Sequence, residues 1–368
     1  MTSQPPIRQP QSPAAKLDIG GSPGLSGWLR KNRISLAVST YQSGKLFLIG
    51  SSSEDRLSIF ERTFERCMGL WSNGQTIWMA TAFQIWRMEN VLDENETIDG
   101  YDRLFVPREG QITGDIDVHD LAIDANGNLV FVNTLFGCLA TFSERFNFQP
   151  LWKPKFLSKI TAEDRCHLNG LAMHDGKARY VTTCSQSDLA GGWREFRTDG
   201  GCVIDVETSE IVVEGFSMPH SPRLYRDKLW LLDSGNGWFG WLEPKTGNFE
   251  RVSFCPGYAR GLAFFEKYAF IGLSRPRREQ TFSGLPLDDA LDEHRQTARC
   301  GIQVVDLESG EVCHWLQFDG IVSELYDVVV LTDVLRPKAI GFKTDEIRHN
   351  VWMKEDGKIN RWIGNPND

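Results

Sequence analysis

Short apolar runs separated by turn residues dominate the chain from Trp28 onward. The runs are rich in β-branched and aromatic residues, and Gly, Asn and Asp punctuate them, as in QTIWMAT, GNLVFVNT and DKLWLLDS. Such runs are typical of β-strands joined by tight turns. Helical periodicity is nearly absent, and its best candidate is the polar stretch 287–297. The hydrophobic pattern therefore predicts an all-β protein.

Six of the runs end in a small hydroxyl residue, and these ends recur every 40 to 53 residues: Thr40, Thr81, Thr134, Thr183, Ser234 and Ser274. Five of the six follow, by 10 to 13 residues, an apolar strand centred on a leucine. We call these the marker leucines: Leu70, Leu121, Leu171, Leu224 and Leu262. A repeat of this length fits one four-stranded blade of a β-propeller.

The two ends of the chain complete this pattern. The first repeat lacks a leucine strand before it, whereas the stretch SELYDVVVL, centred on Leu325, lacks a repeat after it. We therefore predict a six-bladed β-propeller, closed by pairing of this C-terminal strand, as an innermost strand, with the N-terminal blade of residues 34–64. Closure removes the exposed edges that an all-β protein must otherwise protect. A seventh blade completed by residues 339–352 is the nearer alternative, and a pair of β-sandwiches would leave the regular hydroxyl-ended runs unexplained.

The domain boundaries follow from the same reading. Residues 1–25 are rich in Pro, Gln, Ser and Gly, so we expect a disordered N-terminal lead-in. Residues 26–352 form a single propeller and residues 353–368 a C-terminal tail.

Composition narrows the function classes. The 40 Lys and Arg against 49 Asp and Glu give a net charge of −9, which disfavours a nonspecific nucleic-acid binder. No apolar run approaches the roughly 20 residues of a membrane helix, and the N-terminus lacks the apolar segment of a secretory leader. We expect a cytoplasmic protein without nucleic-acid or membrane partners, with its eight scattered cysteines buried as small hydrophobic residues.

The candidate functional residues lie just before the marker leucines, where each innermost strand should meet the entrance of the central tunnel. Because side chains alternate along a strand, the positions two and four residues before each marker share a face. The position at −2 gives Met68, His119, Asn169, Pro222, Arg260 and Ser323. The position at −4 gives Arg66, Asp117, His167, His220, Tyr258 and Ile321. Three of the seven histidines thus collect at one level in three consecutive blades.

Three interpretations of these histidines stay open. In the first, His119, His167 and His220 bind a divalent transition metal, with Asn169 or water completing the shell. In the second, the site is metal-free: a histidine acts as general acid or base and Arg260 grips an anionic substrate. The catalytic residues would then be His119, Arg260 and Asp120. In the third, the histidines form hydrogen bonds between blades.

Two long connections should project over the same entrance, at residues 185–201 and 275–299. Loops of such length in a compact domain are usually lids or binding loops. Trp193 in the first loop is a candidate ligand contact, and arginines in both loops could cap a polar or anionic ligand. The further candidate ligand-binding residues are Asn169, Tyr258, Asp233 and Arg223, although the stretch around Asp233 is also typical of a simple turn.

The fragments VHDLAIDANGNLVFVNT and HLNGLAMHDGKARYVTT resemble the blade signature of the gluconolactonase/SMP-30-like and NHL-type six-bladed propellers. Asn169 matches the position of a metal-ligating Asn in the gluconolactonase branch. That branch also uses acidic ligands, whereas the corresponding blade here reads MPHSPRLY. The resemblance therefore implies the fold and not a lactonase site.

A second resemblance covers nearly the whole ordered chain. The run GWLRKNRISLAVSTYQSGKLFLIG, with HDLA, HLNGLAM, MPHSPRLY and ARGLAF, is similar to an uncharacterised bacterial family of conserved hypothetical propeller proteins. This similarity implies a six-bladed propeller and no particular activity.

The expected function is that of a propeller whose His-rich tunnel entrance binds or acts on a small polar or anionic molecule or a peptide. A divalent transition metal is the candidate cofactor. The alternative is a non-catalytic scaffold that presents the same face to a protein partner.

Overall fold

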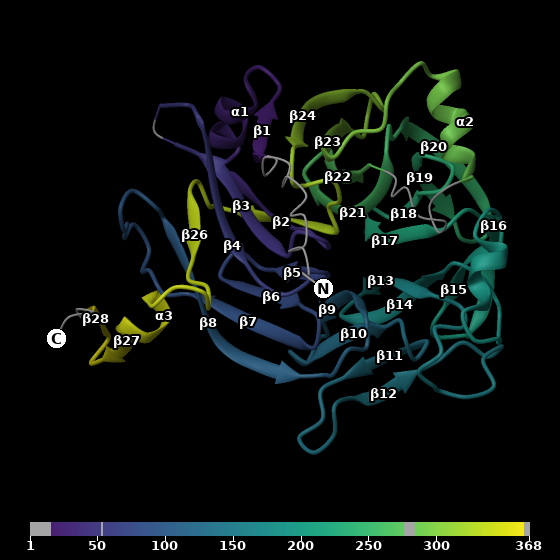
Figure 1. Cartoon of the computed structure of the whole chain (residues 1–368), viewed down its shortest axis with the longest axis horizontal. Helices are drawn as coiled ribbons and strands as arrows, with labels where there is room; N and C mark the ends of the chain where they lie inside the picture. The colour runs from purple at the N-terminus through teal and green to yellow at the C-terminus, as the bar shows by residue number, and fades with distance from the viewer. Residues whose placement is uncertain (1–15, 53, 276–283, 364–368) are drawn as a thin grey trace, which may run out of the picture.

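The computed structural model describes residues 16–52, 54–275 and 284–363. Six sheets of mainly antiparallel strands stand side by side around an axis. Their inner strands surround the middle of the ring (Figure 1) and include β5 (Leu70–Ser72), β9 (Val118–Ile123), β13 (Leu168–His174), β17 (Pro219–Tyr225) and β21 (Tyr258–Phe265). The prediction of a six-bladed β-propeller is confirmed.

The closing blade joins the two ends of the ring. The C-terminal strand β25 (Asp327–Thr332) pairs antiparallel with the N-terminal strand β2 (Ile34–Ser39), with Val328 opposite Val38. Blade 1 continues with β3 (Lys45–Ser51) and β4 (Leu57–Thr63). Head-to-tail closure is therefore as predicted, but the marker of this strand is Val328 and not Leu325.

Blade 2 absorbs the segment that could have started a seventh blade. It consists of β5 (Leu70–Ser72), β6 (Thr76–Ala80), β7 (Gln84–Asn90) and β8 (Arg103–Ile112). The strand β26 (Pro337–Ala339) pairs in parallel with β8 as a fifth strand, so the alternative of a seventh blade from residues 339–352 is wrong.

The next three blades have four strands each. Blade 3 contains β9 (Val118–Ile123), β10 (Leu129–Asn133), β11 (Cys138–Thr141) and β12 (Gln149–Trp152). Blade 4 contains β13 (Leu168–His174), β14 (Lys177–Thr183), β15 (Gly201–Asp205) and β16 (Glu210–Phe216). Blade 5 contains β17 (Pro219–Tyr225), β18 (Lys228–Asp233), β19 (Trp238–Glu243) and β20 (Asn248–Phe254).

Blade 6 gains a strand from the N-terminus. Its strands are β21 (Tyr258–Phe265), β22 (Tyr268–Ser274), β23 (Gly301–Asp306) and β24 (Val312–Asp319). The strand β1 (Asp18–Gly21) pairs with the outer edge of β24, and the helix α1 (Leu25–Lys31) follows it. These segments lie in or border the stretch 1–25 that the sequence analysis expects to be disordered, so ordered structure begins earlier than expected; residues 1–15 lie outside the described residues.

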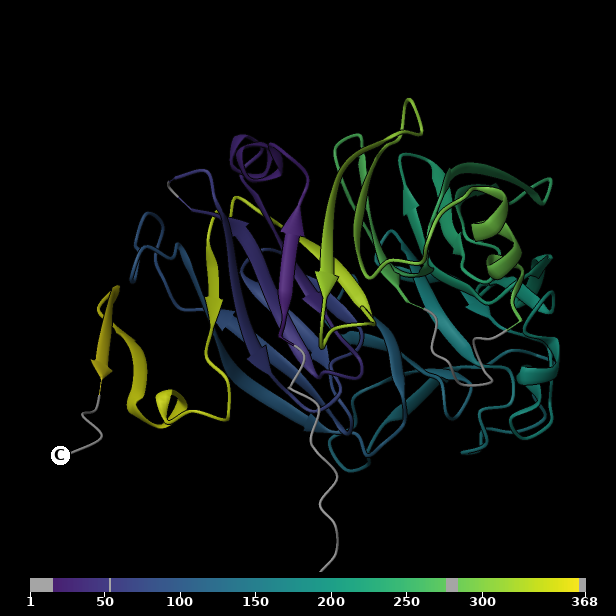
Figure 2. The ribbon, with the colours of Figure 1, turned by 45° about the horizontal axis from the view of Figure 1, so that its top comes forward.

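The remaining elements decorate the ring. The helix α2 (Pro286–Glu293) covers most of the expected helical stretch, and the 3₁₀ helix η1 (Gly192–Phe196) lies in the first long loop. After α3 (Glu346–His349), the hairpin of β27 (Asn350–Glu355) and β28 (Lys358–Ile363) lies outside the ring, beyond β8 (Figures 1 and 2). In the described part of the chain, no helix is long and apolar enough to cross a bilayer.

The core is divided among the seams between blades. A separate cluster of buried apolar side chains fills each of the six seams, including the closing one, where Val38 and Phe47 of blade 1 pack with Phe270 and Phe318 of blade 6. Apolar burial therefore holds each blade to both neighbours.

Several of the hydroxyl groups that end the repeated runs form hydrogen bonds between neighbouring blades. Thr134 donates to the Leu168 carbonyl oxygen at 2.7 Å, Ser234 to that of Ala259 at 2.6 Å, and Ser274 to that of Leu325 at 3.1 Å. Each bond runs from one blade to the inner chain of the next. In the first blade Ser39, next to Thr40, makes the equivalent bond to Met68 at 2.6 Å, whereas the hydroxyl groups of Thr81 and Thr183 bond within their own blades.

Inside the tunnel, the residue before each marker alternates between glycine and a charged side chain. Around the ring these residues are Gly69, Asp120, Gly170, Arg223, Gly261 and Asp327. The Asp120 carboxylate pairs with both terminal nitrogens of Arg223, at 2.7 and 3.1 Å. It also accepts the backbone N–H of Leu171 in the neighbouring blade. The Asp327 carboxylate likewise accepts the backbone N–H of Leu70 in the next blade. The carboxylates of Asp120 and Asp327 and the guanidinium of Arg223 thus join blades around the axis.

Candidate functional site

β-Bulges at the tunnel entrance set the direction of the candidate side chains. The pairing of inner and second strands shifts register next to His119, Asn169, His220 and Arg260, in four consecutive blades. A bulge re-aims the side chain that it carries. The bulges interrupt the strict alternation assumed from the sequence. His220, at −4, nevertheless lies beside Arg260, at −2, as residues that share a face should.

Six side chains meet at this end of the tunnel, and we call them the entrance cluster: Asp117, His119, His167, His220, Arg260 and Tyr326. All but Asp117 are buried, with exposures of 7% or less. The Asp117 side chain keeps 29% exposure, so the cluster meets solvent at this carboxylate.

His119 is held as a neutral imidazole. Its Nδ1 lies 3.0 Å from the Asp117 carbonyl oxygen, which can only accept, so Nδ1 carries the proton. Burial lowers the pKa of His119 to about 4, although the Asp117 carboxylate raises it. The ring packs edge to face against His167, with centroids 4.8 Å apart, and against Tyr326 at 5.5 Å.

His167 is oriented by a carboxylate and a tryptophan. Its Nδ1 lies 3.0 Å from Oδ1 of Asp164, whose Oδ2 accepts the indole N–H of Trp193 at 2.6 Å. Trp193 stacks on the imidazole, with ring centroids 4.2 Å apart. The carboxylate can only accept, so Nδ1 carries a proton and Asp164 fixes the orientation of the imidazole ring.

His220 and Arg260 are bonded to each other. His220 donates from Nδ1 to the Met218 carbonyl oxygen at 2.7 Å, and its Nε2 accepts from Arg260 at 3.3 Å. Burial lowers the pKa of His220, and the Arg260 charge lowers it further. The guanidinium of Arg260 lies over the Tyr326 ring at 4.6 Å and 3.9 Å from Oε1 of Glu324.

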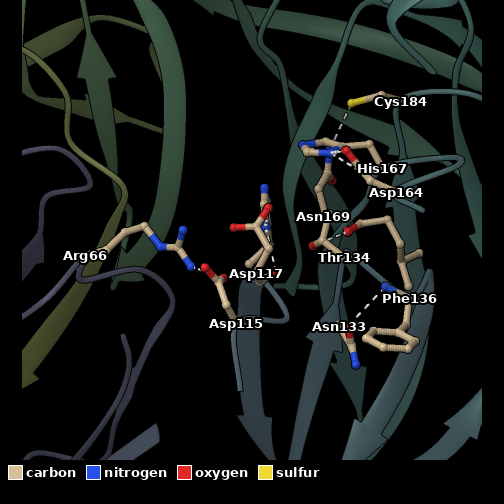
Figure 3. Close-up of polar contacts among 12 residues, drawn as sticks. Arg66, Asp115, Asp117, Asn133, Thr134, Phe136, Asp164, His167, Asn169 and Cys184 are labelled. Carbon is tan, nitrogen blue, oxygen red and sulfur yellow. Dashed lines mark hydrogen bonds and ion pairs between the residues drawn. The ribbon is translucent and has the colours of Figure 1, made fainter. Parts of the chain in front are cut away.

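The Asp117 carboxylate lies between the two sides of the entrance. Figure 3 shows it with Arg66 and Asp115 on one side and His167 and Asp164 on the other. Burial acts to raise the pKa of Asp117, but the pKa stays below its usual range because nearby histidines, Arg66 and Arg260 favour the ionised form.

Three polar atoms of the entrance cluster are buried without a hydrogen-bond partner among the described residues. They are Oδ1 of Asp117, Nε of Arg260 and the hydroxyl of Tyr326. Buried polar atoms are nearly always hydrogen-bonded, and each unsatisfied one costs about 1–3 kcal/mol. Two donors and one acceptor in one cluster thus leave the polar network of the entrance incomplete.

The histidines do not fit a metal site. Within residues 16–52, 54–275 and 284–363, no group of three or more His, Cys, Asp or Glu side chains is placed to hold an ion. The Arg260 guanidinium occupies the Nε2 lone pair of His220 and would repel a cation there. A metal bound by His119, His167 and His220 therefore stays a prediction that this geometry does not favour.

Other predicted site residues use their polar groups in contacts outside the entrance cluster. Asn169 donates to Sγ of Cys184 and accepts from Thr182, so its amide is used within its own blade. Asp120, a predicted catalytic residue, and Arg223, a predicted ligand contact, pair with each other inside the tunnel.

Two further predicted ligand contacts have partners of their own. The Tyr258 ring packs edge to face on His220, and its hydroxyl lies 3.6 Å from Sδ of Met218. The Asp233 carboxylate accepts the Ser217 N–H at 2.9 Å and the Asn236 amide at 2.8 Å, which is the turn chemistry that the sequence left open.

Sequence reasoning missed Asp164, Tyr326 and Glu324. The assumed marker Leu325 placed Ser323 and Ile321 at the entrance, but Ile321 is 45% exposed. With Val328 as the marker, Tyr326 and Glu324 occupy −2 and −4. The pair Tyr326-Asp327 before Val328, which parallels His119-Asp120 before Leu121, was the available signal.

The first long loop lies against the entrance through Trp193, as the sequence predicts. In the second, Arg275 pairs with Asp319 of blade 6. Residues 276–283, which include two of the arginines proposed as ligand contacts, lie outside the described residues.

Stability should depend on pH through His119. The unfolded chain binds a proton at the ordinary pKa near 6.5, whereas the folded pKa is about 4, so the unfolded state binds more protons in between. Stability must therefore rise with pH across this window. We expect the native protein to lose up to about 3 kcal/mol relative to His119→Gln as pH falls from 7 to 4. Urea unfolding of both proteins at several pH values measures this difference.

Asp117, His167 and Arg260 face His119 and are unchanged in that comparison. The matched control is His174→Gln, at a histidine whose side chain is 61% exposed, and its pH curve should follow the native one. Parallel curves for the native protein and His119→Gln would contradict the buried neutral imidazole.

Comparisons with known proteins agree with the geometry at the level of fold. The profile of a family described as "Domain of unknown function (DUF4915)" matches residues 23–340. The sequence matches no curated protein at a significant level. A nidogen/laminin complex structure is 10% identical, covers 82% of this chain and 99% of that chain, and has a TM-score of 0.53.

Two further solved structures are more distant. An inactive virginiamycin B lyase from Staphylococcus aureus, with quinupristin, is 10% identical, covers 82% of this chain and 99% of that chain, and has a TM-score of 0.39. A protein of unknown function from Bacteroides caccae is also 10% identical, with 81% and 98% covered and a TM-score of 0.38. Both likenesses are too weak to carry an argument. The resemblance to gluconolactonase/SMP-30-like and NHL-type propellers stays a prediction.

Proposed function

The chain belongs to the DUF4915 family, whose description assigns no activity, and from its own side chains we propose that it binds a small polar molecule at the entrance cluster. The observation that carries this proposal is the set of three unpartnered buried atoms on Asp117, Arg260 and Tyr326. A ligand that offers acceptors to Arg260 and Tyr326 and a donor to Asp117 would complete the network.

The surroundings support such a site chemically. His119 is a neutral imidazole with Nδ1 bonded to an acceptor, so it offers an Nε2 lone pair for a further donor. The aromatic ring of Tyr326 packs against this imidazole and that of Trp193 against the imidazole of His167, and a few polar groups set among aromatic side chains are typical of small-molecule sites. Hydrogen bonds made away from water discriminate strongly between ligands because an unmatched group stays unsatisfied.

Tyr326→Phe tests the proposal. It removes a hydroxyl that has no hydrogen-bond partner among the described residues, so the free energy of unfolding of the unliganded protein should stay the same or rise by about 1 kcal/mol. Binding of small polar molecules, detected as ligand-induced thermal shifts across a metabolite panel, should be lost. Chemical denaturation and the thermal-shift panel are measured on the same preparations.

The matched control is Tyr258→Phe, because the Tyr258 hydroxyl already contacts Met218. This variant should lose stability. If Tyr326→Phe loses as much stability as Tyr258→Phe and shifts with ligands remain, the Tyr326 hydroxyl serves the fold and the proposal fails.

A further inference from the structure

The arginines near the entrance lie beside acidic side chains other than Asp117. Arg66 forms an ion pair with Asp115, and Arg260 lies 3.9 Å from Glu324. The basic atom next to the Asp117 carboxylate is Nδ1 of His119, which lies 3.6 Å from Oδ2. Burial keeps that imidazole neutral at neutral pH, so it supplies no counter-charge. Among the described residues, Asp117 therefore has no cation in direct contact.

The accessible part of the cluster is also its negative part. The Asp117 side chain is 29% exposed, whereas that of Arg260 is 8% exposed and covered by Tyr326. A ligand arriving from solvent meets the Asp117 side chain first, and the buried Oδ1 lies behind its exposed part. An anion placed there would face like charge in a partly desolvated site, which costs free energy.

We infer that the ligand of the entrance cluster carries a positively charged amino group that binds Oδ1 of Asp117, together with an acceptor oxygen for Arg260 and Tyr326. This inference rests on the proposed function and names its substrate class: a small organic amine with a neighbouring carbonyl or hydroxyl group. It replaces the anionic ligand that the arginines suggest from sequence alone.

The complementarity extends to the rest of the site. An ammonium group has three donors and no acceptor, so it can bind Asp117 and still donate to the lone pair of a neighbouring imidazole. The hydroxyl of Tyr326 and Nε of Arg260 both donate, which suits an oxygen next to the amino group.

Three probes of matched size test the inference: glycinamide, glycolamide and glycolate. Glycinamide has an ammonium and a carbonyl group, glycolamide replaces the ammonium with a hydroxyl, and glycolate is an anion. Dissociation constants are measured at pH 7 by ligand-detected NMR titration against the full chain. We expect glycinamide to bind at least about tenfold more tightly than the other two, because a charge-assisted hydrogen bond is the stronger kind.

Asp117→Asn should abolish this preference while glycolamide binding changes little. Asparagine tolerates the left-handed backbone of this position, where φ is 52–56° in Asp117 and its counterpart His167, so the variant should fold. The matched control is Asp175→Asn, which changes another left-handed aspartate that is 88% exposed on the turn after β13. It should keep the preference for glycinamide.

The outcomes separate this inference from the proposed function. The inferred amine ligand would be wrong if glycolamide or glycolate bound as tightly as glycinamide, or if Asp117→Asn still bound glycinamide more tightly than the other two probes. The proposed site for a polar ligand would remain in either case. If none of the three probes binds the native protein, and Tyr326→Phe loses stability like Tyr258→Phe, both the site and its ligand class are overturned.

Discussion

Replacing Arg223 with methionine should destabilise the propeller by about 3–5 kcal/mol, because it leaves buried carboxylates without their cation. Arg223 pairs with Asp120, whose side chain is 5% exposed, and Asp327 is also buried, at 4%. Burial raises the pKa of Asp327 to about 7, and the Arg223 charge opposes that rise. The loss should therefore be larger at pH 8 than at pH 5, where more Asp327 is protonated.

Urea unfolding at the two pH values measures this effect. The double variant Arg223→Met with Asp120→Asn should recover part of the loss, since it removes one stranded charge. The neighbouring Arg226→Met is the control, because Arg226 lies on the exposed turn after β17 and should change stability little. A loss below about 1 kcal/mol for Arg223→Met would show that the pair across the tunnel is not formed.

Gly261→Ala should cost roughly 3–5 kcal/mol, because this glycine lets the closing strand approach the sixth blade. Its φ of +82° disfavours any side chain, and a Cβ here would come within 2.7 Å of the Asp327 Cα and 2.9 Å of the Val328 nitrogen. Both contacts are with backbone of β25, which cannot move without opening the ring.

Gly127→Ala separates backbone strain from the clash. Gly127 has a φ of +84° with nothing within 4 Å of a Cβ, so alanine there should cost only about 1–2 kcal/mol. Thermal and chemical unfolding compare the two variants. Equal losses would mean that β25 does not pack against Gly261, and the head-to-tail closure would be in error.

The sequence carried enough information for the ring but not for the direction of its side chains. The blade count followed from the hydroxyl-ended runs, and three of these hydroxyl groups, those of Thr134, Ser234 and Ser274, form hydrogen bonds to the next blade. Closure followed from an unpaired strand at each end. The error of three residues in the last marker arose because Leu325 and Val328 are both apolar and both buried.

The hydrophobic pattern does not predict the geometry of the entrance cluster. Alternation predicts which residues share a face, but the bulges at His119 and Arg260 shift that face, and nothing local in the sequence specifies them. Asp164 was missed because it precedes the strand and reaches His167 only through a tight turn. The charge balance that singles out Asp117 depends on which arginine meets which carboxylate, which is a property of the folded chain.

A crystal structure of the protein purified from its natural cells, without exchange into amine buffers, tests the central claim most directly. We expect electron density for a small molecule that contacts Oδ1 of Asp117 through a nitrogen and the Tyr326 hydroxyl through an oxygen. If these atoms instead bond to ordered water alone or to neighbouring protein groups, and soaking with glycinamide leaves them unchanged, the entrance cluster is part of the fold and not a binding site.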